Sequence, residues 1–308
     1  MHFFGITIEQ TAVLFGFMLI GYLLRKTGVF EAKASITLSK LENYVLIPAL
    51  ILNTFCTRFT LDAIENEFSL VVNGLFLTII TILFSYLLTP LLGYKGYSKD
   101  VCRYGLAVPD TGFMGTAVIL GVFGADFYFT FMLFQLTLII TTYSWGFKQI
   151  IPVQGGDKSG FIKRFFNPTM IALIAGILAG ASGLRFPRFV NTLLTNTAGC
   201  MSPIAMILTG VVIAEYDLKM LLSNWKVYIM TFMRLLVIPC LFGLAAVLLK
   251  LDESMIARWL CVLAMPMGLN PVVVASAYGQ DVSQGASMAL ISHVLAVITI
   301  PVIFELFL

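Results

Sequence analysis

Long apolar stretches alternate with short polar connections along most of the 308-residue chain. A membrane-spanning helix needs about 20 mainly apolar residues, and stretches of that kind occur ten times. We therefore predict an all-α membrane protein with ten transmembrane helices, numbered helices 1 to 10 along the chain. Their expected ranges are 6–24, 36–55, 68–90, 101–124, 126–147, 167–184, 191–213, 225–249, 255–279 and 283–307.

The longest polar connection divides the chain into two halves of five predicted helices. It has Gly-Gly-Asp-Lys-Ser-Gly at its centre. We expect residues 1–150 to form the first five-helix repeat, 151–166 to be a cytoplasmic linker and 167–308 to form the second repeat. Because five is odd, the second repeat enters the membrane from the opposite side, so the two repeats are inverted relative to each other.

The two halves share unusual residues at a constant offset of 155 positions. One shared glycine means little, but a constant offset across several helices is typical of an internal repeat. The pairs are Gly21 with Gly176, Gly28 with Gly183, Pro48 with Pro203, Arg103 with Arg258, and Gly124-Ala125-Asp126 with Gly279-Gln280-Asp281.

Composition agrees with a protein whose solvent is lipid. The chain is 59% hydrophobic and 11% charged. A soluble protein of this length could not bury so much apolar surface in one core. The net charge of +3 is spread among the loops, so no nucleic-acid partner is expected. The five cysteines follow neither a disulfide nor a metal-binding spacing, and we expect no metal and no cofactor.

Lys and Arg in the loops predict the orientation in the membrane. Twelve of them lie on one side and five on the other, and the richer side is normally cytoplasmic. This places the 148–164 loop in the cytoplasm and both termini outside, in a multi-pass protein of the plasma (inner) membrane.

Two predicted helices are interrupted near mid-membrane. Helix 4 contains Val-Pro-Asp-Thr-Gly-Phe-Met-Gly at 108–115, and helix 9 contains Met-Pro-Met-Gly-Leu-Asn-Pro at 265–271. Proline removes a backbone donor and glycine permits unwound backbone, so both helices are expected to break. The freed N–H and C=O groups cannot face lipid; they must be paired or line a polar cavity.

Where two broken helices cross, their second halves present helix N-termini, which carry partial positive charge, to an anion. We therefore predict a site for a small organic anion at the crossing; the alternative is a pair of ordinary proline kinks. The expected breaks are Pro109 and Pro266, and the expected substrate-binding residues are Asp110, Thr111, Gly112, Gly268, Asn270 and Pro271.

Two other polar residues deep in predicted helices are candidates, with Asp110, for charge compensation or ion coupling. Arg234 lies about ten residues into helix 8, so its side chain is expected to face the protein interior. It either pairs with Asp110 or replaces a coupling cation, or it is a structural ion pair or carbonyl clamp. His293 either carries a proton or makes an ordinary interhelical hydrogen bond.

Several motifs together resemble the auxin efflux carrier family, which includes the plant auxin exporters and many prokaryotic relatives. They are Gly-Tyr-Leu-Leu-Arg-Lys-Thr-Gly-Val-Phe in helix 1, Asp-Thr-Gly-Phe-Met-Gly in helix 4, Arg-Leu-Leu-Val-Ile-Pro in helix 8, Asn-Pro in helix 9 and Ile-Thr-Ile-Pro in helix 10. The similarity covers essentially the whole chain.

The resemblance implies a scaffold of helices 1, 2, 6 and 7 and a transport domain of helices 3–5 and 8–10 that moves against it like an elevator. Related folds occur in bile-acid sodium symporters and sodium/proton antiporters. It also implies a carboxylate or auxin-like acid as substrate, and a homodimer through the scaffold helices.

The chain departs from the family pattern at Asp110, where asparagine is usual. An amide binds a substrate carboxylate without charge, whereas an ionised Asp110 repels it. Either this carboxyl is protonated, or a cation or basic side chain neutralises it, or the substrate is not a simple anion.

An enzyme is not expected. Gly-Ala-Ser-Gly at 180–183 resembles an intramembrane serine-protease motif with His293 as base, but it ends helix 6 instead of beginning a submerged helix. The remaining alternatives are a proton- or sodium-coupled symporter or antiporter of another small solute, and a ligand sensor with a transporter fold. Whether H⁺ or Na⁺ is the coupling ion stays open.

Overall fold

The computed structural model describes residues 2–31, 33–59, 67–151, 167–184 and 186–308, and regular structure within these ranges is helical. The helices, with π-helical segments labelled η, are α1 (His2–Lys26), α2 (Ala34–Leu41), η1 (Glu42–Leu46), α3 (Ile47–Arg58), α5 (Phe68–Leu91), α6 (Gly96–Ala107), α7 (Met114–Phe134), α8 (Leu136–Thr141), η2 (Thr142–Gly146), α9 (Phe147–Ile150), α11 (Pro168–Ala181), α12 (Arg188–Gly199), α13 (Met201–Glu215), α14 (Leu218–Ser223), α15 (Trp225–Phe232), η3 (Met233–Val237), α16 (Ile238–Leu248), α17 (Glu253–Leu263), α18 (Asn270–Ala277) and α19 (Ser283–Phe307).

Six of the described helices are long and apolar enough to cross a membrane, or up to seven if a bent pair counts as one span. The ten predicted spans are therefore not all present as single long helices. The predicted helices at 101–124 and 255–279 are each divided in two, and α11 has only 14 residues. The number of spans and their inversion stay predictions.

The interruptions are where the prolines and glycines predict them. The first break, residues 108–113, separates α6 from α7, and the second break, residues 264–269, separates α17 from α18. A further kink at 124 has a positive φ of 79°, which glycine adopts without strain.

The prediction of an unbroken helix at 126–147 is wrong. The chain bends by 52° between α7 and α8, at Gln135. The Gln135 backbone leaves the helical region (φ −86°, ψ 5°), and its side-chain amide donates to the Met132 sulfur at 2.8 Å. Neither proline nor glycine marks this position in the sequence.

Two of the π-helical segments precede a proline by the same distance. Pro48 and Pro239 each lie two residues beyond the end of a segment, η1 and η3 respectively. A proline ring clashes with the carbonyl one turn earlier, which widens the helix there. The wide turns place Glu42 and Arg234 in the interior, where both are fully buried.

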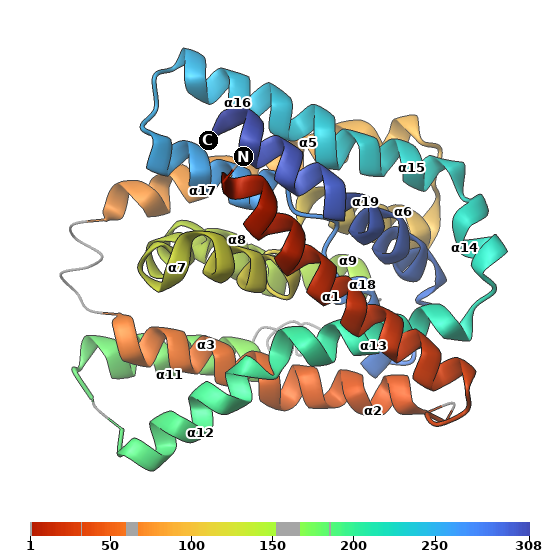
Figure 1. The fold of residues 1–308 in the computed structure, drawn as a ribbon, viewed down its shortest axis with the longest axis horizontal. Coiled ribbons are helices and arrows are strands. Elements are labelled where there is room, and N and C mark those ends of the chain that lie inside the picture. The colour runs from red at the N-terminus through yellow and green to blue at the C-terminus, as the bar shows by residue number, and fades with distance from the viewer. Residues whose placement is uncertain (1, 32, 60–66, 152–166, 185) are drawn as a thin grey trace.

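Helices from the first half of the chain pack against helices from the second half in two corresponding contacts. α1 packs along α13, and α11 packs along α3 (Figure 1). Gly21 lies against the backbone of Ile207, and Gly176 lies against the backbone of Leu52. Each member of the second contact is 155 residues from its counterpart in the first, as a two-fold repeat requires.

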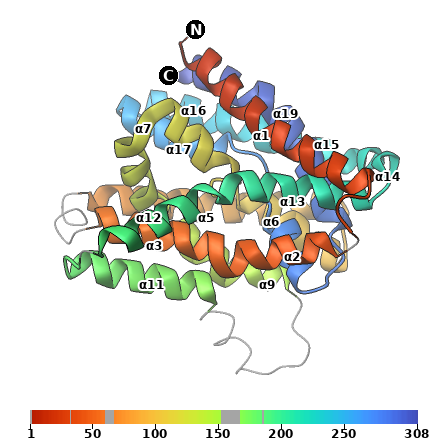
Figure 2. The same ribbon diagram turned by 60° about the horizontal axis from the view of Figure 1, so that its bottom comes forward.

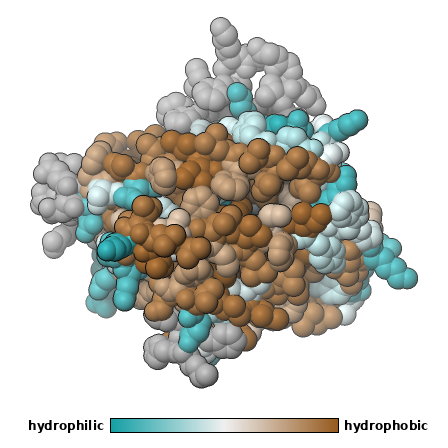
Figure 3. Space-filling model, turned by 90° about the horizontal axis from the view of Figure 1, so that it is seen from above, coloured by the Kyte–Doolittle hydropathy of each residue, from teal (hydrophilic) through white to brown (hydrophobic). Residues whose placement is uncertain are grey.

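Side chains on the outer surface are largely apolar. In Figure 3 they cover most of the visible face, with polar residues gathered at its margins. Over the described surface as a whole, the exposed fractions of the side chains of Leu87, Leu91, Leu178 and Leu248 are 65% to 78%. So continuous an apolar surface is not stable in water and is suited to lipid.

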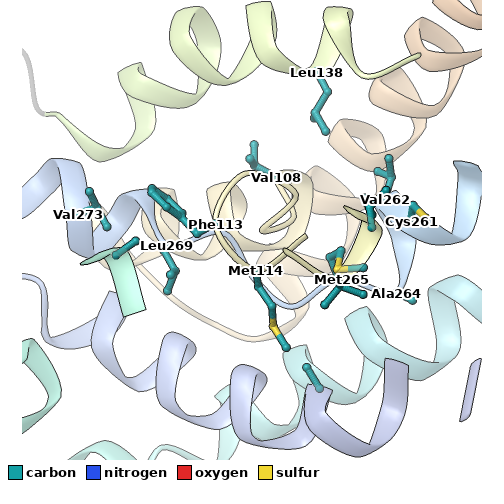
Figure 4. Packing of buried hydrophobic residues seen from close by; sticks show 14 of the residues in the cluster. Val108, Phe113, Met114, Leu138, Cys261, Val262, Ala264, Met265, Leu269 and Val273 are labelled. Atoms are coloured by element: carbon teal, nitrogen blue, oxygen red, sulfur yellow. The ribbon is translucent and has the colours of Figure 1, made fainter. Parts of the chain in front are cut away.

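The elements form two groups with the breaks between them. α2, α3, α11, α12 and α13 lie together in Figures 1 and 2, away from α15, α16 and α17. The core surrounds the breaks. Figure 4 shows Val108 and Met114 of the first break region near Met265 of the second, within one buried apolar cluster.

Candidate binding site at the two helix breaks

The two breaks are held together by their backbones. The Asp110 N–H donates to the Pro266 carbonyl at 2.9 Å, and the Gly268 N–H donates to the Val108 carbonyl at 3.0 Å. These bonds form an antiparallel bridge between Pro109 and Met267. Backbone groups that lose helical partners at one break thus find partners at the other, as burial requires.

Asp110 occupies the N-terminus of α7. Its Oδ1 accepts the Phe113 N–H at 3.0 Å, and its Oδ2 accepts the Met114 N–H at 3.1 Å. A carboxylate here satisfies orphan donors and favours the positive end of the helix. The sequence led us to expect this N-terminus to face a substrate anion, but the protein's own carboxylate takes that place.

His293 from α19 completes the Asp110 environment. Its Nε2 lies 3.0 Å from Asp110 Oδ2, and its Nδ1 lies 2.9 Å from the Ala289 carbonyl oxygen. A carbonyl only accepts, so Nδ1 carries a hydrogen, and the bond between Nε2 and the carboxyl then requires one further proton. Whether that proton resides on nitrogen or oxygen, the pair is neutral overall.

The second break has no comparable carboxylate. α18 begins without a side-chain cap. The Asn270 amide nitrogen donates to the Tyr104 hydroxyl at 2.6 Å, while its Oδ1 is buried without a partner. Rotation of the amide by 180° lets Tyr104 donate to Oδ1 and places two N–H donors where the unpartnered oxygen now lies.

Arg234 connects the ends of the two preceding half-helices. Its guanidinium donates to the carbonyls of Val262 (2.7 Å), Met265 (3.3 Å) and Leu106 (3.5 Å). A cation at these C-terminal ends balances both helix dipoles. Of the interpretations drawn from the sequence, these contacts match the carbonyl clamp; Arg234 does not pair with Asp110, whose side-chain partner is His293.

A cavity of about 80 Å³ lies beside the breaks and is partly open to solvent. It is smaller than the usual small-molecule site, so an organic acid requires its walls to move apart. Six residues of the predicted breaks and binding site line it, whereas Pro266 and Pro271 do not. The six are Pro109, Asp110, Thr111, Gly112, Gly268 and Asn270.

Several residues that line the cavity were not predicted from the sequence. Tyr104 and Tyr143 come from α6 and η2, and Gln135 from the unpredicted bend. Gln135 Oε1, like Asn270 Oδ1, is buried without a partner. Nothing in the local sequence distinguishes these residues from ordinary core positions, and only the bend and the break bring them together.

A larger hollow, the vestibule, adjoins the cavity and has a volume of about 570 Å³. Leu50, Thr116 and Tyr128 line both spaces. The hydroxyls of Thr116 and Tyr128 lie 3.2 Å apart at this boundary. The vestibule's polar lining includes Asn53 and Thr57, near the end of α3.

An apolar helical bundle with a cavity at two paired helix breaks is the architecture of a membrane transporter. The chain belongs to the membrane transport protein family, the auxin efflux carrier family that its motifs resemble, and the family model matches residues 6–159 and 156–304. It is similar to an uncharacterized transporter from Methanothermobacter thermautotrophicus (strain Delta H), with 24% identity over 302 residues covering 98% of each chain. The resemblance is confirmed, and the family is one of membrane transporters, not of enzymes.

Proposed function

We propose that the protein is a secondary carrier that moves a small organic anion across the plasma membrane by an elevator-type movement. The anion, a carboxylate or auxin-like acid, binds in the cavity at the two breaks. The observation that carries this proposal is the second break: an uncapped helix N-terminus beside a buried amide with no partner for one of its atoms.

The charge pattern supports an anion at the second break. Asp110 does not repel it, because the pair with His293 is neutral in either protonation form. The uncapped start of α18 supplies partial positive charge, and the rotated Asn270 amide supplies N–H donors. Gln135 has a second amide whose oxygen has no partner, and rotation of this amide by 180° places N–H donors at that position.

The position of the cavity supports the elevator movement. Ile47 and Ile51 of α3 and Met201 of α13, from the proposed scaffold, line one part of it, and the two breaks line the rest. A sliding movement between the two groups carries the breaks and exposes the site to alternate sides. With the predicted orientation, the vestibule opens to the outside.

Uptake into proteoliposomes tests the proposal, with labelled indole-3-acetate and succinate as probes. We expect saturable uptake of at least one probe and a loss of about tenfold or more in Asn270→Ala, since a hydrogen bond to a charged group contributes about 1.5–3 kcal/mol. Asn73→Ala is the matched control, because the Asn73 amide bonds only within its own helix, to the Ser69 carbonyl.

Thermal unfolding with each acid, at two pH values and with or without sodium, separates binding from coupling. A ligand-induced shift in wild type that is lost in Asn270→Ala supports the site. Uptake equal to that of protein-free vesicles, from folded protein and with both probes, contradicts an organic-anion carrier of this class. Uptake unchanged in Asn270→Ala contradicts the site.

A further inference from the structure

Glu42, at the start of η1, is a buried carboxyl that the binding site does not use. Its side chain is 0% exposed, and neither carboxyl oxygen has a hydrogen-bond partner. An ionised carboxylate without partner or counter-charge is strongly unfavourable in such surroundings. The carboxyl therefore carries a proton in this conformation. π-helical segments such as η1 are often found at functional sites.

The groups around Glu42 supply no counter-charge. Tyr143 of η2 is the titratable neighbour that interacts with it, and the Tyr143 hydroxyl bonds to Thr169. α11 and α18 pack against η1 and carry no titratable side chain. Lys40, two residues before Glu42, is exposed to solvent.

The other helices that pack against η1 place their ionisable groups elsewhere. Arg188 and Cys200 on either end of α12 are exposed. Glu215 at the end of α13 is paired with Arg25 at 3.9 Å. On α3, the Cys56 thiol is directed to the Gly176 carbonyl, and Arg58 ends the helix four turns from Glu42.

Glu42 lies beside a contact that α2 and η1 make with α18. On either side of it, the Ser39 hydroxyl and the Asn43 amide both donate to the Val273 carbonyl of α18, the latter at 3.3 Å. We call Ser39, Glu42, Asn43 and Val273 the seal. It joins the proposed scaffold to the half-helix that begins at Asn270.

From the order of residues along the chain, we infer that the seal lies at the end of the cavity opposite the vestibule. Along one continuous span, 39–43 form the seal, 47–51 line the cavity, and 50–57 line the vestibule. A movement that opens the cavity to the other side must therefore part α18 from η1, which admits water to Glu42.

We propose that Glu42 is a proton-binding site that links the state of the seal to protonation. The closed seal holds the carboxyl protonated; when the seal opens, the O–H bond breaks, the proton passes to water and the carboxylate stays on the protein. One proton is bound and released per cycle. The inference rests on the movement in the proposed function but not on the substrate.

Distance measurements between spin labels test this without a substrate. Labels are placed at Lys40→Cys on the scaffold and Gln280→Cys just beyond α18, in a chain whose five native cysteines are replaced. We expect one distance distribution at low pH and a second, longer one above a midpoint, with the ratio of populations changing up to about tenfold per pH unit for one proton.

Glu42→Gln keeps the volume but cannot ionise, so its distributions are expected to stay the same from pH 5 to 9. Glu31→Gln, an exposed carboxyl before the same span, is expected to behave as wild type. If Glu42→Gln is not monodisperse, Glu42→Met replaces it. A pH response that persists in these variants, or no pH response in wild type, overturns the proposal; failure of organic-acid uptake alone affects only the proposed function.

Discussion

The two breaks occupy equivalent places in the two predicted repeats, but only the first has a carboxylate at the start of the helix that follows it. At the first, Asp110 is anchored by two backbone N–H groups and by His293. At the second, the offset of 155 residues places Met265 where a carboxylate would be needed, and α18 is left uncapped. One helix N-terminus is neutralised by the protein itself, and the other is open to a ligand.

This difference suggests separate roles for the two breaks: the first holds the structure together, and the second is the proposed place for the ligand. The first break is a structural fixed point, because its charge and its donors are satisfied within the protein. The second keeps an unsatisfied amide oxygen beside the cavity, which is costly, and this cost is why we propose the ligand site there. Arg234 serves both breaks alike, since its three carbonyl partners come from the two sides.

The largest expected effect concerns this shared support. Arg234→Leu removes the donors of three buried carbonyls at two helix ends, and we expect a loss of about 3–5 kcal/mol in unfolding free energy. Arg234→Lys is expected to restore part of it, because an ammonium cannot reach all three carbonyls. Denaturant unfolding in detergent measures both variants.

Arg103→Leu is the control for charge removal. Arg103 is only partly buried, and its Nη1 lies 3.3 Å from Oδ1 of Asp100, whose side chain is exposed to solvent. We expect a change below about 1 kcal/mol. A similar loss in Arg103→Leu and Arg234→Leu would show that the clamp has no special role in holding the breaks.

An alanine substitution in each break tests whether the first break contributes more to stability than the second. Asp110→Ala leaves two helix N–H groups and the His293 Nε2 atom without partners, so we expect a loss of about 2–4 kcal/mol in stability. Asn270→Ala removes one bond to Tyr104 and is expected to cost about 1 kcal/mol. Thermal unfolding without ligand compares the two variants.

Asp110→Asn sharpens the same comparison, since the amide keeps one acceptor for α7 but cannot share a proton with His293 in the same way. We expect its stability to lie between wild type and Asp110→Ala. If Asn270→Ala is the less stable of the two alanine variants, the assignment of a structural first break and a binding second break is wrong.

The positions of proline and glycine made the two breaks predictable, but the residues that contact each break could not be predicted. Proline and glycine act on the backbone at their own positions, so the sequence locates both interruptions and the unusual Asp110. The contact between Asp110 and His293 joins residues 183 positions apart. Periodicity places a residue on a helix face but does not say which helix covers that face, so this pairing stayed open.

Features that depend on packing were missed for the same reason. The bend at Gln135 has no proline or glycine signal, and no local pattern indicates that the wide turn of η1 directs Glu42 inward. The carbonyl clamp of Arg234 was one of several interpretations, because three carbonyls from two distant helices cannot be identified from one helix pattern.

The smallest expected effect tests whether the two breaks must touch. A Cβ at Gly268 would lie 2.9 Å from the Val108 carbonyl oxygen, which accepts the Gly268 N–H, whereas a Cβ at Gly112 meets nothing within 4 Å. We expect Gly268→Ala to cost about 1–3 kcal/mol and Gly112→Ala to change stability by less than about 0.5 kcal/mol. Because both glycines line the cavity, equal losses in thermal unfolding would mean that loss of cavity space, and not separation of the backbones, is responsible; unequal losses locate the effect in the bridge between the breaks.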